Sequence, residues 1–457
     1  MRAGTVVVHH ADLRADRPPY AEAVSAATTD DEFADIGTAT IDALHYGLDL
    51  DWNATAKQLT GTETLTFRAP KPATEVELDL GPSMRVTSAI LDGHKVATTH
   101  HGFVISIATG ALKTDSHHVL VIGYRGKPAP FTAPSGDAGA SGGGWHTEAD
   151  GEVWTLQEPV GALTWYPVND EPSDKAFYDV TWHTEARWTG VSDGQLTEDA
   201  VRGGVRTTHW ALDSPAASYL TTAAIGPYAE YTQTGPHGLP LSYWVLPKDR
   251  GALKTLRTSP QLLGWLEQRL GSLPFRSLGD VVIPAYSAVE TQTMVTMGAP
   301  ILRLPDPDAL LLHEYVHQWY GDEVTPSGFK DLWLNETFAY YLQLTWEASH
   351  DRTTTGQWEA MVDREDQRLR TKDGPPADPS PKTFAALNVY ACGARMLARL
   401  KSMLGATTLA RLIRDWPGRH RFGNADRAEW VSYLDQVSGK NLTGLANRWL
   451  LSRTSPK

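Results

Sequence analysis

The hydrophobic period of this chain changes near residue 230, and no other sequence feature limits the fold as strongly. From about residue 39 to 228, apolar residues alternate with polar ones in short segments, as at Leu48, Leu50 and Trp52. A period of two is typical of strands with one buried face. A further strand candidate at 281–283 is followed by helical patterns to the end of the chain. The sequence therefore predicts a multi-domain α+β protein, with an all-β domain before a mainly helical one.

A chain of 457 residues is longer than a domain with a single hydrophobic core usually is, so we expect more than one domain. Residues 1–37 are polar and show no sustained period, which predicts a flexible N-terminal tail. The β domain is expected at 38–229 and the helical domain at 230–457. Within the β domain, Asp92 and Gly93 have the composition of a hairpin turn, which indicates an antiparallel sheet.

Charge and composition exclude several classes of partner. The formal net charge of −13 repels phosphate backbones, so nucleic acid is not expected as a partner. Cys392 is the single cysteine, so no intrachain disulfide can form. The sequence contains neither a transmembrane stretch nor a signal peptide. We expect a cytoplasmic protein, or a secreted or cell-envelope protein if the chain is a trimmed form or its start codon is misassigned. The sequence leaves the oligomeric state open.

The strongest chemical signal is the run HEYVH at 313–317, which has the pattern HExxH. On a helix, His313 and His317 share one face and can bind one Zn²⁺, while Glu314 lies beside the open position of the metal. Because this short pattern also arises by chance on amphipathic helices, a third ligand is needed to support the interpretation.

Glu336 provides that third ligand. It follows His317 after 18 intervening residues, in the run DLWLNETFAY, and is expected on a second helix that folds back against the first. Two histidines and one glutamate leave a fourth position for water, which is the arrangement of a catalytic rather than a structural zinc site. The sequence therefore predicts one Zn²⁺ per chain.

The HEYVH run, the WLNET run at 333–337 and their spacing resemble the aminopeptidase N family of gluzincin zinc metallopeptidases, which also includes leukotriene hydrolase. The segment SAVET at 287–291 stands where that family has its GxMEN exopeptidase motif. Tyr390 matches the catalytic tyrosine of the family, and Glu158 matches an acidic or amide residue of its N-terminal domain. The resemblance covers about residues 39–450 and implies a saddle-like antiparallel β domain followed by a thermolysin-like catalytic domain, without the large C-terminal helical domain of longer members.

The chain departs from the family pattern at several positions. The departures are Ser287 for glycine, Val289 for methionine, Thr291 for asparagine, Thr337 for glycine and Cys392 for lysine. These changes affect how closely the protein backbone can approach the substrate and what shape the pocket has. The preferred N-terminal residue of the substrate therefore stays open.

The resemblance implies a role for each of the two catalytic residues. A bound Zn²⁺ lowers the pKa of its water to about 7, so Glu314 needs only to accept and relay one proton as general base. Attack on a peptide carbonyl places negative charge on its oxygen, which Tyr390 is expected to stabilise.

An aminopeptidase must also recognise a free α-ammonium group, which calls for carboxylates beside the metal. Glu158 and Glu290 are the expected anchors. Ser287 and Ala288 follow a strand and are expected to form an exposed edge that pairs with the substrate backbone. The expected substrates are therefore peptides with a free N-terminus.

Three other functions are compatible with the same zinc motif. A zinc endopeptidase would lack the amine anchors, and a catalytically silent binding or scaffold relative would have no need of Glu314 and Tyr390. Epoxide hydrolysis on a lipid occurs within the family, but no feature of this sequence requires it.

Overall fold

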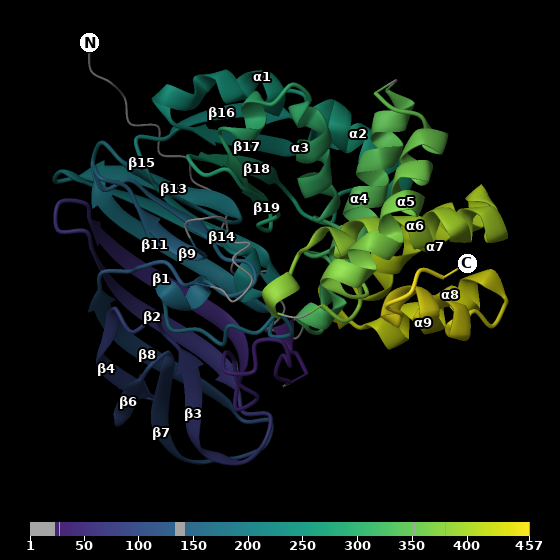
Figure 1. The fold of residues 1–457 in the computed structure, drawn as a ribbon. Helices are drawn as coiled ribbons and strands as arrows, with labels where there is room; N and C mark the ends of the chain where they lie inside the picture. The colour runs from purple at the N-terminus through teal and green to yellow at the C-terminus, as the bar shows by residue number, and fades with distance from the viewer. Residues whose placement is uncertain (1–22, 27, 133–141, 351, 380, 457) are drawn as a thin grey trace.

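The computed structural model describes residues 23–26, 28–132, 142–350, 352–379 and 381–456. A β domain lies on one side of the molecule and a helical domain on the other, in the predicted order along the chain (Figure 1). In the described part of the chain, no helix is both long and apolar enough to cross a bilayer.

The β domain is built around an eight-stranded sheet with the order β13-β14-β11-β1-β2-β8-β4-β5. Its strands are β1 Asp42–Asn53, β2 Gln58–Arg68, β4 Met84–Leu91, β5 His94–Lys95, β8 His117–Gly126, β11 Ala176–Glu185, β13 Gln195–Arg202 and β14 Val205–Ala216. All neighbouring pairs are antiparallel except β1 and β11. The alternation at Leu48, Leu50 and Trp52 buries these side chains, and Asp92 and Gly93 form the β4–β5 turn, as predicted.

Two smaller sheets complete this domain. One contains β3 Ala73–Asp79, β6 Thr98–His101 and β7 Val104–Leu112; the other contains β9 Gly144–Thr147, β10 Val153–Leu156, β12 Thr189–Ser192 and β15 Ala223–Gly226. All four residues of β10 are buried, and the strand ends two residues before Glu158. The second small sheet therefore carries one of the predicted amine anchors.

The helical domain begins with a five-stranded sheet of order β16-β17-β18-β20-β19. Its strands are β16 Ala229–Thr234, β17 Pro240–Val245, β18 Leu278–Ile283, β19 Ala288–Val289 and β20 Met294–Gly298. The strand candidate at 281–283 lies in β18, and its complete burial explains why it reads as a continuous apolar run. The segment after it forms β19, at the edge of the sheet.

Nine helices follow one another through the described part of this domain. They are α1 Leu253–Leu256, α2 Ser259–Leu270, α3 Pro307–Val316, α4 Trp333–Ser349, α5 Thr355–Asp373, α6 Leu387–Leu404, α7 Ala406–Arg419, α8 Arg427–Ser438 and α9 Thr443–Leu451. Two short strands, β21 Thr325–Pro326 and β22 Asn424–Ala425, pair in parallel between them. One hydrophobic cluster includes buried residues of both domains, so the β domain is packed against the helical domain.

The segment after residue 27 packs between the two domains, which differs from the flexible tail expected over 1–37. The carboxylate of Asp30 accepts a hydrogen bond from the backbone N–H of Phe329. Phe33 is buried with its ring 5.6 Å from that of Phe329. Few apolar residues anchor this segment, so they give no periodic signal in the sequence. Residues 1–22 of the expected tail lie outside the described part.

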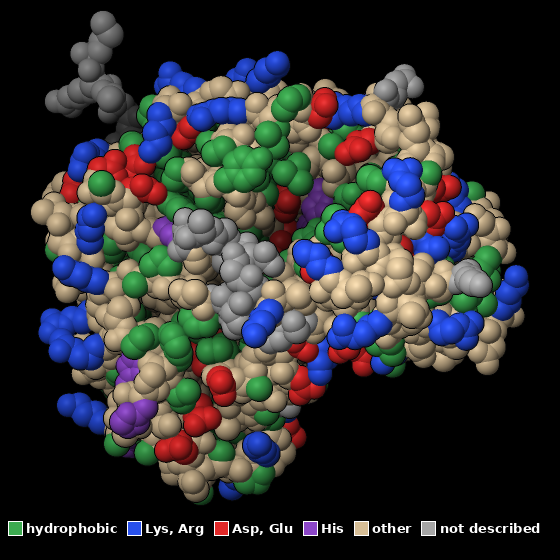
Figure 2. Space-filling model, in the orientation of Figure 1, with side chains coloured by type: hydrophobic (Ala, Val, Ile, Leu, Met, Phe, Trp, Pro, Cys, Tyr) green, Lys and Arg blue, Asp and Glu red, His purple; other side chains and the backbone are tan. Residues whose placement is uncertain are grey.

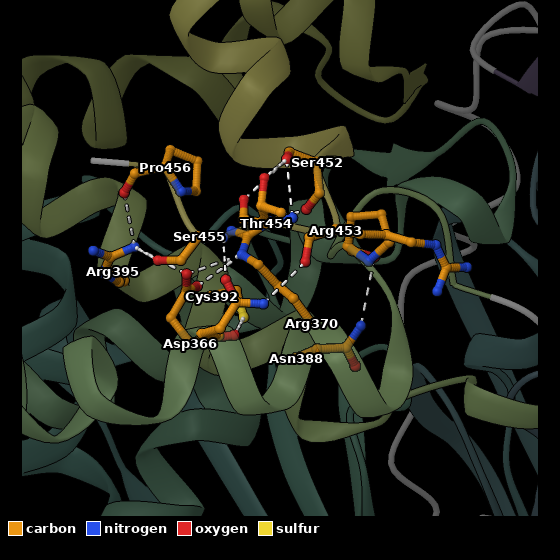
Figure 3. Close-up of polar contacts among 12 residues, drawn as sticks. Asp366, Arg370, Asn388, Cys392, Arg395, Ser452, Arg453, Thr454, Ser455 and Pro456 are labelled. Carbon is orange, nitrogen blue, oxygen red and sulfur yellow. Dashed lines mark hydrogen bonds and ion pairs between the residues drawn. The ribbon is translucent and has the colours of Figure 1, made fainter.

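The C-terminal segment 452–456 lies against α5 and α6 (Figure 3). Arg370 of α5 pairs with Asp366 at 3.0 Å, and both side chains are fully buried. Arg370 also donates to the carbonyl of Ser452 at 2.8 Å. Arg395 of α6 contacts Asp366 at 2.9 Å and donates to the hydroxyl of Ser455 at 2.7 Å. One buried carboxylate thus joins two helices and the end of the chain.

Candidate active site

Helices α3 and α4 bring the three predicted zinc ligands together. His313 lies on α3, His317 follows its last residue, and Glu336 lies in the first turn of α4. The Nε2 atoms of His313 and His317 lie 3.2 and 3.5 Å from the same carboxylate oxygen of Glu336. All three side chains are buried. The local sequence motif and the distant glutamate therefore form one cluster.

The far side of each imidazole is held by a hydrogen bond. Nδ1 of His313 lies 3.1 Å from the amide oxygen of Gln343 on α4, and Nδ1 of His317 lies 3.0 Å from the carbonyl oxygen of Tyr320. Because both partners are acceptors, each Nδ1 carries a proton, and each Nε2, which faces Glu336, is the nitrogen left to bind a metal. This is the orientation in which both rings can bind a metal.

The geometry of the three ligand atoms fits zinc. They lie within 4.8 Å of one another. Two zinc bonds of about 2.0–2.1 Å at a tetrahedral angle separate their ligand atoms by about 3.3–3.4 Å. The distances of 3.2 and 3.5 Å from Glu336 to the two histidines agree with that separation. Two imidazoles and one carboxylate are also the donor types that zinc prefers.

Glu314 lies on the same helix and faces the same cluster. Its carboxylate is within 4.8 Å of His317 and Glu290. Burial raises the pKa of Glu314 to about 8, and the neighbouring His317 offsets only part of this effect. Glu314 is therefore in contact with the metal-ligand cluster without belonging to the set of His313, His317 and Glu336.

Glu158 and Glu290 meet at this site although 132 positions separate them in the sequence. Glu158 follows β10 of the β domain, and Glu290 follows β19 of the helical domain. Carboxylate oxygens of both lie within 4.8 Å of Glu336 and of each other. Burial, with the nearby Glu290 carboxylate, raises the pKa of Glu158 well above its ordinary value. The Oε1 atoms of Glu158 and Glu290 have no hydrogen-bond partner among the described residues. Such a group of carboxylates, of which Glu290 and Glu336 are buried and Glu158 is half-buried, favours a cationic ligand.

The predicted substrate edge is β19. Ala288 and Val289 pair with β20 on one side, and β19 is the last strand of its sheet in the described part of the chain. Ser287 and Ala288 are half-buried. The segment therefore has the edge position that the sequence predicts, directly before Glu290.

Tyr390 lies in the first turn of α6, beside the ligand cluster. Its ring stacks on that of His313, with centroids 5.9 Å apart and an angle of 21° between the planes. Burial raises the pKa of its hydroxyl well above the ordinary value, so the group stays protonated and can donate a hydrogen bond.

The departure at Thr337 has a structural reason. Its hydroxyl donates to the carbonyl of Val389 at 3.0 Å, which ties α4 to α6 one residue before Tyr390. A Cβ atom at Gly393 would lie 1.6 Å from the Thr337 hydroxyl oxygen. Thr337 and Gly393 thus fit as a pair, and they fix the distance between the helices that carry Glu336 and Tyr390.

Three further departures, at Val289, Thr291 and Cys392, lie in buried surroundings. Val289 belongs to a small apolar cluster with Trp154 and Leu156 of β10. The hydroxyl of Thr291 lies 2.9 Å from that of Thr296. Cys392 is buried, and burial raises the pKa of its thiol. None of these departures removes a residue of the ligand cluster.

Gln318 is a supporting residue that sequence reasoning missed. Its side-chain amide donates to the carbonyl of Glu290 at 3.3 Å and accepts from the backbone N–H of Thr293 at 3.0 Å. The only sequence signal was a polar residue directly after His317 in an otherwise buried run. Gln318 connects the metal-binding segment to the amine-anchor segment.

The space-filling view shows acidic and histidine side chains at the base of a hollow near the middle of the molecule (Figure 2). Residues 42–220 match the family model for the peptidase M1 N-terminal domain, and residues 306–449 match the model for the peptidase family M1 domain. The chain belongs to peptidase family M1. The predicted resemblance to aminopeptidase N is thereby confirmed.

Aminopeptidase N of Lactobacillus delbrueckii subsp. lactis is 25% identical over 438 residues, which cover 89% of this chain and 50% of that protein. Aminopeptidase N of Streptomyces lividans is 26% identical over 332 residues, which cover 65% of this chain and 38% of that protein. The M1 chain thus spans half or less of the length of these relatives.

Solved structures of similar length match nearly the whole M1 chain. A two-domain M1 zinc metallopeptidase bound to L-arginine has a TM-score of 0.82 at 25% identity, over 94% of this chain and 98% of that one. The M1 zinc metallopeptidase of Deinococcus radiodurans has a TM-score of 0.80 at 24% identity, with the same coverage. The fold of a β domain followed by a helical catalytic domain is therefore that of known M1 zinc metallopeptidases.

Proposed function

We propose that this protein is a zinc-dependent aminopeptidase that hydrolyses the N-terminal bond of peptides with a free N-terminus. The observation that carries the proposal is the approach of Glu158 and Glu290 to Glu336 within 4.8 Å. A zinc endopeptidase has no need of extra buried carboxylates at the metal, whereas an aminopeptidase needs them to bind an ammonium group. The aminopeptidase names of the similar proteins support the same activity.

His313, His317 and Glu336 would hold the metal. When bound, Zn²⁺ would supply Lewis-acid chemistry, which activates water near neutral pH and polarises a carbonyl. The hydrogen bonds that the two Nδ1–H groups donate to Gln343 and Tyr320 leave both Nε2 atoms for the metal.

With the metal bound, its positive charge would favour the ionised form of Glu314, which can then accept a proton from the attacking water and transfer it to the departing amine. Its carboxylate is buried beside His317, so bulk water does not compete for the proton. Positioned general bases typically contribute about 10²–10⁴-fold to the rate.

Tyr390 donates a hydrogen bond to the carbonyl oxygen as negative charge develops on it. Its stacking on His313 holds the ring beside the metal site, and the contact between Thr337 and Val389 holds its helix. The hydroxyl thus acts in the transition state more than in the bound substrate.

Glu158 and Glu290 bind the α-ammonium of the substrate, assisted by the charge of Glu336. Because Glu158 comes from the β domain, the packing of the two domains closes one end of the site. A closed end leaves room for a single residue before the scissile bond, and the carboxylates favour a charged amine there.

Hydrolysis of a panel of aminoacyl fluorogenic substrates, with and without a chelator, tests the proposal. We expect about one zinc per chain, activity that is lost on chelation, and a Glu314→Gln variant that keeps its metal while its kcat falls about 100-fold or more. Full activity in a preparation without stoichiometric metal contradicts the proposal.

A further inference from the structure

A cavity of about 680 Å³ lies among α2, α4, α6 and α7, and it is partly open to solvent, since seven of its fourteen lining residues are exposed. Tyr341 and Leu342 of α4 and Leu409 and Ile413 of α7 contribute apolar surface to it, and all four are largely buried. No residue of the candidate active site lines this cavity. Its volume lies within the range of about 300–1,000 Å³ that is common for small-molecule pockets.

The polar part of the lining is cationic. Arg269 of α2, Lys401 of α6 and Arg411 and Arg414 of α7 line the cavity, against one carboxylate, that of Asp415. This local excess of positive charge stands in a chain with a net charge of −13. The field inside the cavity therefore attracts anions, although the chain as a whole repels them.

Among the described residues, none of the four cations forms an ion pair with a carboxylate. The guanidinium of Arg269 stacks 3.5 Å from the ring centroid of Trp265, and Arg411 donates to a backbone carbonyl at 2.6 Å. The side chains of Lys401 and Arg414 make no hydrogen bond within the described part of the chain. An anion entering the cavity thus displaces no existing ion pair.

The beginning of α7 adds to this field. Ala406 and Thr407, the first two residues of the helix, line the cavity. Gly405 precedes them and offers no side-chain acceptor to the first-turn N–H groups. These groups carry partial positive charge that favours an anion.

We propose that this cavity binds an amphipathic organic anion, a carboxylate attached to an apolar body. The cations and the first turn of α7 bind the carboxylate, and the surface formed by Leu409, Ile413 and Leu342 binds the body. This site is distinct from the peptide-binding site and does not depend on the proposed peptidase activity.

Isothermal titration of the full chain with decanoate tests the proposal, with decylamine and acetate as comparison ligands. We expect one decanoate per chain, and no binding of decylamine, which has the same body and the opposite charge. Acetate lacks the body and should bind at least about tenfold more weakly. Absence of decanoate binding, or equal binding of decylamine, overturns the proposal.

Two variants locate the site. Arg414→Glu reverses an unpaired charge, and Ala410→Trp fills the cavity from an exposed position on α7. Each should weaken decanoate binding by about tenfold or more. Lys254→Glu, which makes the same charge change at an exposed position outside the lining, should leave binding unchanged. If both cavity variants bind decanoate like the wild type while circular dichroism confirms their fold, the proposal is wrong.

Discussion

Glu63 provides a test of the β-domain core that is independent of catalysis. It lies on the inner face of β2, is fully buried, and neither carboxylate oxygen has a hydrogen-bond partner among the described residues. Its polar neighbours are the buried hydroxyls of Tyr46, Tyr124 and Tyr166, which all stay neutral because burial raises their pKa values. Burial likewise raises the pKa of Glu63 well above the ordinary value of 4.5.

The pH dependence of stability follows from this shift. Above pH 4.5 the unfolded chain releases the Glu63 proton and the folded chain keeps it, so Glu63 stabilises the fold less as the pH rises. One proton changes the free energy of unfolding by about 1.4 kcal/mol per pH unit. Between pH 5.5 and 7.0, Glu63 therefore lowers the stability of the wild type by about 2 kcal/mol relative to a side chain that cannot ionise.

The perturbation is Glu63→Gln, which keeps the shape and removes the ionisation. Urea unfolding, followed by tryptophan fluorescence, measures the free energy of unfolding of both proteins at pH 5.5 and 7.0. From pH 5.5 to 7.0, the free energy of unfolding of the variant should rise by about 2 kcal/mol relative to that of the wild type. The matched control is Glu198→Gln, on an exposed position of β13, which should give no such gain. Equal pH dependence in Glu63→Gln and the wild type would show that Glu63 is ionised in the fold and would contradict the prediction.

Further predictions concern Tyr390 of α6 and Arg370 of α5. Tyr390→Phe should lower kcat about 10²-fold with little change in KM, because the hydroxyl acts in the transition state. Steady-state kinetics measure both constants, and an unchanged kcat would mean that Tyr390 serves packing alone. Arg370→Met should lower the free energy of unfolding by about 3 kcal/mol, because it removes an ion-pair partner of the fully buried Asp366. Chemical unfolding measures this loss, and a loss below about 1 kcal/mol would contradict a stabilising role of the buried pair.

The sequence predicted the order of the domains and the chemistry of the site, because both depend on local patterns. The change from a period of two to helical patterns records which faces are buried in each domain. The HExxH run and Glu336 are recognisable because a metal requires particular donor types at a helical spacing. The meeting of Glu158 and Glu290, by contrast, followed only from the family resemblance, since no local pattern specifies how two domains pack.

The supporting contacts could not be predicted because their partners are distant and their residue types are common. Gln343 and Gln318 are ordinary polar residues until folding brings His313 and the Glu290 carbonyl to them. In the sequence, Thr337 is only a departure from the family glycine. The structure explains the departure, because Gly393 lies opposite and leaves space for the threonine side chain.

We expect this M1 protein to require a free N-terminus on its substrate, and one ratio measures that requirement. The ratio compares kcat/KM for a peptide with kcat/KM for its N-acetylated form, in the wild type and in Glu290→Ala. Loss of a charge-assisted contact worth about 1.5–3 kcal/mol should lower kcat/KM for the free peptide by about one to two decades. The acetylated peptide should stay a poor substrate of both, because the closed end of the site remains.

We therefore expect a high ratio in the wild type and a ratio lower by about one to two decades in Glu290→Ala. A high ratio that the substitution leaves unchanged would remove Glu290 from the amine site. A wild-type ratio near one would contradict the aminopeptidase assignment and indicate an endopeptidase instead.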